Sequence, residues 1–266
     1  MPRRPSHPPI ALLTDFGVAD AYVGTLKGVL RARRFAGDII DLSHEVLPQA
    51  AREAAFLLWS SYRHFPSGTL FVCVVDPGVG TARAILACRT RRFRFLAPAN
   101  GLLDLVLQDE PRAECVAVGP EALRRFGAEE VSATFHGRDL FAPLAAAVAG
   151  GRALSSLGPR IERPAQTFGT IMSPAEPIAP VILHVDRFGN LVTNVRAVEG
   201  VTRDRCSVRI RGTWVRTWAR TYAEMPDRTV CLVAGSSGLI EASVRNGSAA
   251  RHLNAGLDAH VEVRWK

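Results

Sequence analysis

A chain of 266 residues with 47% hydrophobic and 22% charged residues is typical of a globular protein that can bury a core without disulfide or metal staples. Its net charge of +8 would suit nucleic-acid binding, but the arginines are spread along the chain without an RNA-module or helix-turn-helix pattern. Nucleic-acid binding is therefore not expected, and a compositional bias of the genome toward arginine is the simpler explanation of the charge.

The first half of the chain alternates between apolar strands and helical patterns. Residues 10–14 are apolar and end in Asp15-Phe16-Gly17, and the run 69–75 is apolar and rich in β-branched side chains. Further strands are predicted over 39–42, 84–88 and 93–97, and helices over 21–34, 48–62, 102–108 and 140–149. This alternation predicts an N-terminal α/β domain over 10–158, with a mainly parallel sheet and helices on both faces.

The composition changes after residue 158. Five prolines between 159 and 180 indicate a linker, and the remaining chain, 181–266, shows little helical periodicity. Candidate strands there are 181–185, 191–195, 206–210, 214–218, 230–233 and 260–265. Their short, regular spacing predicts a smaller C-terminal β-barrel domain.

The termini and the cysteines bear on location. Residues 1–9 are basic and rich in proline, with no apolar signal segment after them, so we expect a short disordered leader. The apolar run 140–150 is too short to span a membrane. The five cysteines are far apart without a Cys-x-x-Cys pair, which favours buried thiols, a cytoplasmic location and no zinc site.

The most informative stretch is residues 74–83, Val-Val-Asp-Pro-Gly-Val-Gly-Thr-Ala-Arg. It places Asp76 at the carboxyl end of a buried strand, beside glycines that let backbone and ligand approach closely. Asp-Pro-Gly is also common turn material, so this stretch alone leaves a structural and a catalytic role equally open.

Other polar residues also have structural alternatives. His136 could be a core histidine, Arg138-Asp139 a local ion pair, and residues 186–190 a hairpin turn. The phosphate-binding loops of common nucleotide sites and the Gly-x-Ser-x-Gly elbow of serine hydrolases are absent from the sequence.

Six motifs in one order carry a family resemblance. They are Leu-Thr-Asp-Phe-Gly at 13–17, Val-Asp-Pro-Gly-Val-Gly-Thr at 75–81, Pro-Ala-Asn-Gly-Leu-Leu at 98–103, Thr-Phe-His-Gly-Arg-Asp at 134–139, Asp-Arg-Phe-Gly-Asn-Leu at 186–191 and Gly-Ser-Ser-Gly at 235–238. Together they resemble the S-adenosyl-L-methionine (SAM) hydroxide adenosyltransferase family, which is related to the SAM-dependent fluorinase and chlorinase. The resemblance implies the same two-domain fold, and a homotrimer whose active sites lie between neighbouring subunits.

The resemblance implies a SAM hydrolase. In that reaction, hydroxide derived from water attacks the ribose C5′ of SAM and yields adenosine and L-methionine. The family's water-handling trio corresponds to Asp76, Arg83 and His136. SAM is the substrate, so no further cofactor is implied, and neither nucleic acid nor a membrane is an expected partner.

Substrate-binding roles are implied at seven positions. Asp15 corresponds to the acid that grips the ribose hydroxyls, and Asp186 to the acid that holds the methionine ammonium group. Ser236 corresponds to a position near the methionine carboxylate. The remaining positions, which line the adenosine and methionine parts or meet the adenine edge, are Phe188, Asn190, Glu241 and Val244. The chain departs from the family pattern at Ala99 and Ala133, where an acid and a second serine are frequent.

Two alternatives remain open at this point. A SAM-dependent halogenase is disfavoured because a desolvated halide would face the carboxylate of Asp76. A sensor that binds SAM or adenosine with negligible turnover would look similar in sequence, because binding and catalytic residues overlap. The sequence does not indicate the physiological purpose, nor whether another adenosyl sulfonium is the true substrate.

Overall fold

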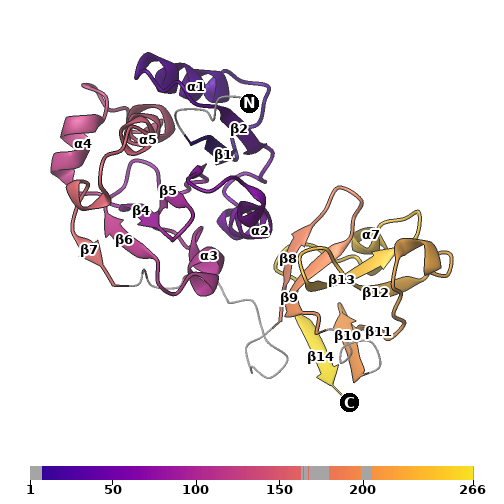
Figure 1. Cartoon of the computed structure of the whole chain (residues 1–266). Helices are drawn as coiled ribbons and strands as arrows, with labels where there is room; N and C mark the ends of the chain where they lie inside the picture. The colour runs from indigo at the N-terminus through magenta and orange to yellow at the C-terminus, as the bar shows by residue number, and fades with distance from the viewer. Residues whose placement is uncertain (1–7, 163, 165–166, 168–179, 199–204, 266) are drawn as a thin grey trace, which may run out of the picture. The chain divides into compact units, whose positions relative to one another are not determined.

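The computed structural model describes residues 8–162, 164, 167, 180–198 and 205–265 (Figure 1). It divides into two compact units, Met1–Phe168 and Gly169–Lys266, and each is described by itself. Most of the predicted leader, and residues 163, 165–166 and 168–179 of the predicted linker, lie outside the described residues. No helix within the described part of the chain is long and apolar enough to cross a membrane.

The first unit contains seven strands and five α-helices among its described residues. The strands are β1 (Ile10–Thr14), β2 (Ile39–Ser43), β3 (Leu70–Val74), β4 (Ile85–Arg89), β5 (Arg94–Pro98), β6 (Glu114–Ala117) and β7 (Arg160–Ile161). The helices are α1 (Tyr22–Ala32), α2 (Ala51–Ser61), α3 (Asp104–Asp109), α4 (Pro120–Phe126) and α5 (Ala142–Ala149), with a π-helix, η2, over Gly137–Phe141.

All seven strands belong to one sheet, in the order β2-β1-β3-β5-β4-β6-β7. Strands β2, β1, β3 and β5 pair in parallel, whereas β4, β6 and β7 extend the sheet with antiparallel pairs. The predicted α/β class is therefore confirmed. The alternation of strands and helices is interrupted between β4 and β5, which pair as neighbours in an antiparallel hairpin rather than through a helical crossover.

Helices cover both faces of this sheet (Figure 1). Helix α1 buries Val23, Leu26 and Leu30, at the spacing of one helical face, and packs with α5 against one side. Helices α2 and α3 pack together on the other side. There the rings of Phe71 and Phe95 stack at 5.3 Å between centroids. The apolar strands β1 and β3 are buried throughout, as expected of central parallel strands.

The expectation of free thiols is wrong at two positions. Cys88 in β4 and Cys115 in β6 form a disulfide, because antiparallel pairing places them directly opposite with Cα atoms 4.2 Å apart. Their separation of 27 residues along the sequence gives no sign of this pairing. Cys73, Cys206 and Cys231 are buried free thiols, as predicted.

The second unit is built from antiparallel strands. They are β8 (Ile182–Val185), β9 (Leu191–Arg196), β10 (Cys206–Ile210), β11 (Thr213–Val215), β12 (Val230–Ala234), β13 (Leu239–Val244) and β14 (Val261–Trp265), with a short helix, α7 (Ala249–Leu253). They form a four-stranded sheet, β12-β13-β9-β8, and a three-stranded sheet, β11-β10-β14. Both sheets contribute to one apolar core that includes Leu191, Val208 and Ile240.

The predicted β-barrel requires a correction, because the described strands do not close into a continuous ring. The two sheets meet through isolated bridges, Val181 with His260 on one side and Trp218 with Leu232 on the other. Each of these joins is a single bridge rather than a continuous ladder. The result is a pair of sheets around a shared core, with barrel-like joins at both edges.

Candidate active site

The topology of the first unit has a switch point between β1 and β3, where a crevice is expected in sheets of this kind. From β1 the chain crosses to β2 on one side, and from β2 it returns past β1 to β3 on the other. Ligands in open α/β sheets bind at such a switch point, beyond the carboxyl ends of the strands. Thr14 and Val74, the last residues of β1 and β3, lie in register. Asp15 and Asp76 therefore both follow strand ends that border this crevice.

The loop after β3 folds back to pair Asp76 with Arg83. The Arg83 guanidinium donates to Asp76 Oδ2, and both side chains are buried, at 10% and 5% exposure for Arg83 and Asp76. The backbone N–H of Gly78 donates to Asp76 Oδ1 at 3.2 Å, and Arg83 Nη1 donates to the carbonyl of Ala84 at 2.6 Å. A carboxylate and a guanidinium are thus held in a fixed geometry out of bulk solvent.

A glycine brings this loop against the segment that carries His136. Gly80 has φ +79°, and a Cβ atom there would lie 2.5 Å from the carbonyl oxygen of Ala133. Only glycine permits both the backbone conformation and this close approach. His136 directly precedes the π-helix η2, a form of helix that often occurs at functional sites. Asp76, Arg83 and His136, the trio implied by the resemblance, therefore lie near one another in the first unit.

The electrostatics of the cluster keep His136 neutral. Burial lowers the pKa of His136, and the positive charge of Arg83 lowers it further, whereas Asp76 and Asp139 act in the opposite direction. Asp139 is itself occupied by Arg138, whose Nη2 atom lies 2.8 Å from Asp139 Oδ2. The predicted local ion pair between Arg138 and Asp139 is confirmed, and the neutral imidazole next to Asp76 can accept a proton.

Asp15 lies at the end of β1 and is half-buried, with its Oδ2 accepting the backbone N–H of Gln49 at 2.8 Å. Its neighbour Phe16 is part of an aromatic cluster that the sequence did not reveal. The rings of Phe16, Tyr22 and Phe135 lie 5.1 to 5.9 Å apart, in tilted or edge-on geometry. Since Phe135 precedes His136, this cluster ties the Asp15 loop to the histidine.

A chain of polar side chains in close contact behind Asp15 was also missed. Thr14 Oγ1 lies 2.8 Å from Nδ1 of the buried His44, and His44 Nε2 lies 3.0 Å from Asp41 Oδ1. Asp41 in turn pairs with Lys27 at 2.6 Å. Thr14 is fully buried, so this chain fixes the end of β1 and with it the backbone of Asp15.

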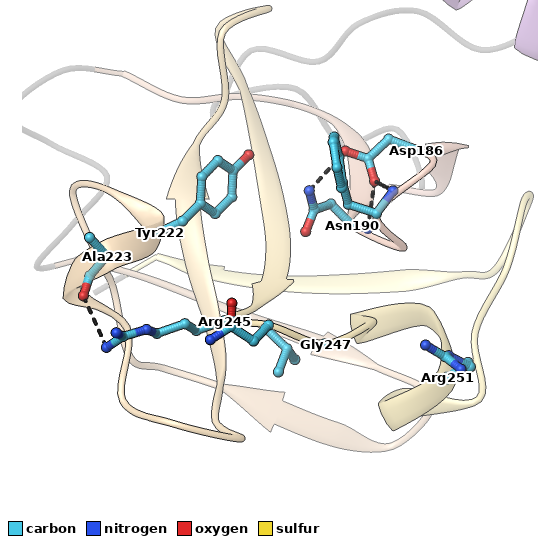
Figure 2. A pocket seen from close by; sticks show the side chains of 10 residues that line it. Asp186, Asn190, Tyr222, Ala223, Arg245, Gly247 and Arg251 are labelled. Carbon is cyan, nitrogen blue, oxygen red and sulfur yellow. Dashed lines mark hydrogen bonds between the residues drawn. The ribbon is translucent and has the colours of Figure 1, made fainter.

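The second unit contains a cavity of about 750 Å³, a volume typical of a small-molecule site (Figure 2). Of the predicted substrate-binding residues, Asp186, Phe188, Asn190 and Val244 line it. Six further lining residues were not predicted from the sequence: Tyr222, Ala223, Arg245, Asn246, Gly247 and Arg251. Figure 2 shows Tyr222 and the Asp186–Asn190 turn on opposite sides of the view, with Arg245 hydrogen-bonded to the carbonyl of Ala223 below them.

Asp186 organises the turn between β8 and β9. Its Oδ1 accepts the backbone N–H groups of Phe188 and Asn190 at 2.9 and 2.8 Å, and its Oδ2 accepts the side-chain amide of Asn190 at 2.8 Å. The hairpin-turn reading of this motif is therefore correct as structure. Phe188 projects from the turn with 76% of its surface exposed, beside the cavity that it lines.

Glu241 and Ser236 do not line this cavity. Glu241 is buried in β13, accepts a hydrogen bond from the hydroxyl of Tyr222 at 3.3 Å, and so touches a lining residue. Burial raises the pKa of Glu241, and the charge of Asp186 raises it further, against the lowering effect of the Tyr222 hydrogen bond. Ser236 is exposed in the turn between β12 and β13.

Comparison with known protein families gives a match for each of the two units. The family model of the SAM hydroxide adenosyltransferase N-terminal domain matches residues 10–158, and that of the C-terminal domain matches residues 181–262. The chain belongs to the SAM hydroxide adenosyltransferase family. Both the trio in the first unit and the lined cavity in the second lie within the matched residues.

Several relatives carry assigned activities, and the hydrolases among them are similar over nearly the whole chain. The (R)-S-adenosyl-L-methionine hydrolase of Thermus thermophilus is 37% identical, covering 96% of this chain and 98% of its own. A fluorinase of Actinoplanes is more distant, at 26% identity over 73% of each. The crystal structure of an uncharacterized conserved protein from Thermotoga maritima matches with a TM-score of 0.84 and 30% identity, covering 96% of this chain and 99% of that one.

Proposed function

We propose that the chain hydrolyses SAM to adenosine and L-methionine, with Asp76, Arg83 and His136 handling the nucleophilic water. The observation that carries this proposal is the buried Asp76–Arg83 ion pair beside a neutral His136, at the switch point of the sheet. The naming of relatives at up to 37% identity as (R)-S-adenosyl-L-methionine hydrolases supports it.

The chemistry demands an activated nucleophile rather than a general acid. The sulfonium leaves as a neutral thioether, so the leaving group needs no proton and no further cofactor. Forming hydroxide from water at neutral pH costs about 12 kcal/mol, from a water pKa near 15.7. Arg83 offsets part of this cost by stabilising the developing negative charge, and Asp76 or His136 can take the proton.

Asp15 is proposed to accept hydrogen bonds from the ribose hydroxyls and so to position C5′. A carboxylate offers two acceptor oxygens for a diol, and in-line placement of C5′ against the water supplies several kcal/mol of the barrier reduction. In the second unit, the cavity lined by Asp186, Phe188, Asn190 and Val244 supports nucleoside or amino-acid binding. Glu241 and Ser236 remain proposed contacts of the adenine edge and the methionine carboxylate.

The same carboxylate disfavours halogenation, although fluorinases are relatives. A desolvated halide placed against Arg83 would also face Asp76, whose Oδ2 is bonded to that guanidinium. The repulsion between the halide and the Asp76 carboxylate opposes halide binding, because the buried pair is poorly screened by solvent. Formation of a 5′-halo-adenosine in chloride or fluoride, without adenosine, would contradict the hydrolase proposal.

An isotope experiment tests the proposed function against a sensor with negligible turnover. Incubation of enzyme in excess over SAM in ¹⁸O-labelled water is expected to give adenosine with label in its 5′-hydroxyl, because the new C5′–O bond uses solvent oxygen. Mass spectrometry of adenosine and quantification of L-methionine provide the readout. Tight SAM binding without product would favour the sensor instead.

The pH dependence of turnover should report the state of His136. Burial and Arg83 hold the pKa of His136 below its ordinary value of 6.5, so the imidazole stays neutral at pH 7 and becomes charged only in more acidic solution. We expect kcat/KM to be flat near neutrality and to fall with decreasing pH at a midpoint below 6.5. The His136→Gln variant, which cannot titrate, should lose that limb, and a wild-type midpoint above 6.5 would contradict this role.

Assembly and location belong to the same proposal. We infer a homotrimer with active sites between subunits, as the family resemblance implies, and light scattering should then give three times the chain mass of 28.8 kDa. We also propose a cytoplasmic location, supported by three buried free thiols. The disulfide partners Cys88 and Cys115 are at most 2% exposed, and burial shields that bond from reductants.

A further inference from the structure

The first unit also contains a cavity, and two of the trio residues lie in its wall. It has a volume of about 270 Å³ and lies between the start of β4, helix α4 and the π-helix η2. Arg83 and His136 both line it, and most of the remaining wall is apolar, formed by Ile85, Val118, Leu123 and Leu140. We call this cavity the trio chamber.

Two nitrogen atoms of the chamber residues have no hydrogen-bond partner among the residues that the structure describes. Arg83 Nε and His136 Nδ1 are buried and make no hydrogen bond to any described residue. Buried polar atoms are almost always paired, either with protein or with ordered water. A water molecule takes about 30 Å³ of liquid volume, so the chamber has room for several. Because Arg83 and His136 supply polar groups to an otherwise largely apolar wall, the chamber suits a few ordered water molecules.

The geometry of the proposed reaction requires such a site. In an in-line displacement at C5′, the incoming oxygen must lie opposite the departing sulfur. The bound substrate occupies the side of the sulfur, and water cannot replace it there during the reaction. The nucleophile therefore needs its own approach to Arg83 and His136.

We propose that the trio chamber is the entry and holding site for the nucleophilic water, separate from the path of the substrate. This inference rests on the proposed hydrolysis of SAM. Water enters past Leu123, which is only half-buried on α4, and is drawn to Arg83 and His136 because the rest of the wall is largely apolar. The chamber thereby sets the size of nucleophile that reaches C5′.

Methanol serves as a probe of nucleophile size. Its oxygen would attack C5′ as the C5′–S bond breaks, methionine leaves as the neutral thioether, and the hydroxyl proton passes to solvent. The product is 5′-O-methyladenosine, formed in competition with adenosine. The ratio of the two products depends on access of the nucleophile and is independent of how much active enzyme or bound SAM is present.

Two substitutions at Leu123 change the chamber in opposite directions. Leu123→Ala should raise the ratio of 5′-O-methyladenosine to adenosine by about tenfold, the lower end of the discrimination that a small change in an apolar pocket produces. Leu123→Phe should lower both the ratio and kcat, with KM for SAM unchanged. Val118→Leu, which also narrows the chamber, replaces Leu123→Phe if that variant does not fold.

Leu107→Ala provides a matched control. Leu107 lies on α3 and lines a different cavity of about 300 Å³ in the same unit, whose lining contains none of Asp76, Arg83 and His136. This variant should keep the wild-type product ratio, with thermal unfolding of each variant measured alongside. An unchanged ratio in the Leu123 variants, with adenosine still formed, would overturn the chamber as the route for water. Failure of the wild-type chain to form adenosine at all would instead overturn the proposed function, and the chamber with it.

Discussion

Replacing Asp76 with asparagine is expected to lower the single-turnover rate of SAM hydrolysis by about 10²–10⁴-fold, the range that a positioned acid or base contributes. Asparagine keeps the shape and can still meet Arg83, but it carries no negative charge and accepts no proton. Arg83→Ala should produce a loss of similar size, because it removes the group that stabilises the developing hydroxide. Quenched-flow measurement of adenosine with enzyme in excess gives both rates.

The loss should lie in chemistry and not in binding. Both variants should retain nucleoside affinity, measured by calorimetry with adenosine. Glu114→Gln breaks an exposed ion pair with Arg89 at 2.8 Å on the same sheet and serves as the control, with a rate within about twofold of wild type. Unchanged rates in both trio variants would remove Asp76 and Arg83 from the mechanism.

Much of the fold could be predicted because its central strands can be recognised from their apolar residues alone. Strands β1 and β3 are almost entirely apolar, and each is followed within two residues by an acid with a glycine two positions beyond it. Burial on both faces of a parallel sheet produces such runs, and the residues that end them mark the functional edge. The same local features indicated Asp15 and Asp76 as site residues, although they did not show that the two loops border one crevice.

Strand β13 was missed for a physical reason. Its six residues, Leu239–Val244, are all buried, yet Glu241 and Ser243 interrupt the apolar pattern. Glu241 is tolerated inside because Tyr222 donates to it and because its raised pKa favours the neutral acid. A buried polar residue that is paired by a distant side chain cannot be recognised from its neighbours in sequence.

The residues that hold the candidate site in place could not be recognised from the sequence either. The Thr14–His44–Asp41 chain joins residues 30 positions apart, and the ring of Phe135 meets Phe16 and Tyr22 across more than 110 residues. Neither set has a local motif, because the sheet topology brings the residues together. Sequence therefore revealed the side chains expected to touch substrate, whereas the structure was needed to find those that hold them in place.

Gly189→Ala should destabilise the second unit and weaken its binding of adenosine, because the added Cβ atom would lie too close to Ser248. Gly189 has φ +81°, and a Cβ atom there would lie 2.1 Å from Ser248 Oγ and 3.0 Å from Ser248 Cα. Ser248 caps α7 by accepting the N–H of Arg251, and the carbonyl of Gly189 accepts the N–H of Ala250. The substitution therefore pushes α7 away from the turn that carries Phe188 and Asn190, and both sides of this contact line the 750 Å³ cavity.

Gly212→Ala serves as the control, because it introduces the same backbone strain without a close contact such as the one with Ser248. Gly212 has a similar φ of +86°, but no atom lies within 4 Å of its added Cβ. Gly212→Ala should lower the free energy of unfolding by about 1–2 kcal/mol, because alanine must adopt a left-handed backbone conformation. Gly189→Ala should lower it by about 1–3 kcal/mol more, because its Cβ atom also overpacks against Ser248. Three of the four tryptophans, Trp214, Trp218 and Trp265, belong to the second unit, so urea unfolding followed by tryptophan fluorescence reports mainly on it.

The two glycine variants should also differ in ligand binding. Gly189→Ala should weaken adenosine binding by at least about tenfold, the equivalent of 1.4 kcal/mol, because Asn190 and Arg251 no longer face one cavity. Gly212→Ala should bind adenosine as the wild type does, since its turn between β10 and β11 contributes no residue to that cavity. Equal destabilisation with equal affinity in the two variants would show that the contact between Gly189 and Ser248 does not organise the turn that lines the cavity.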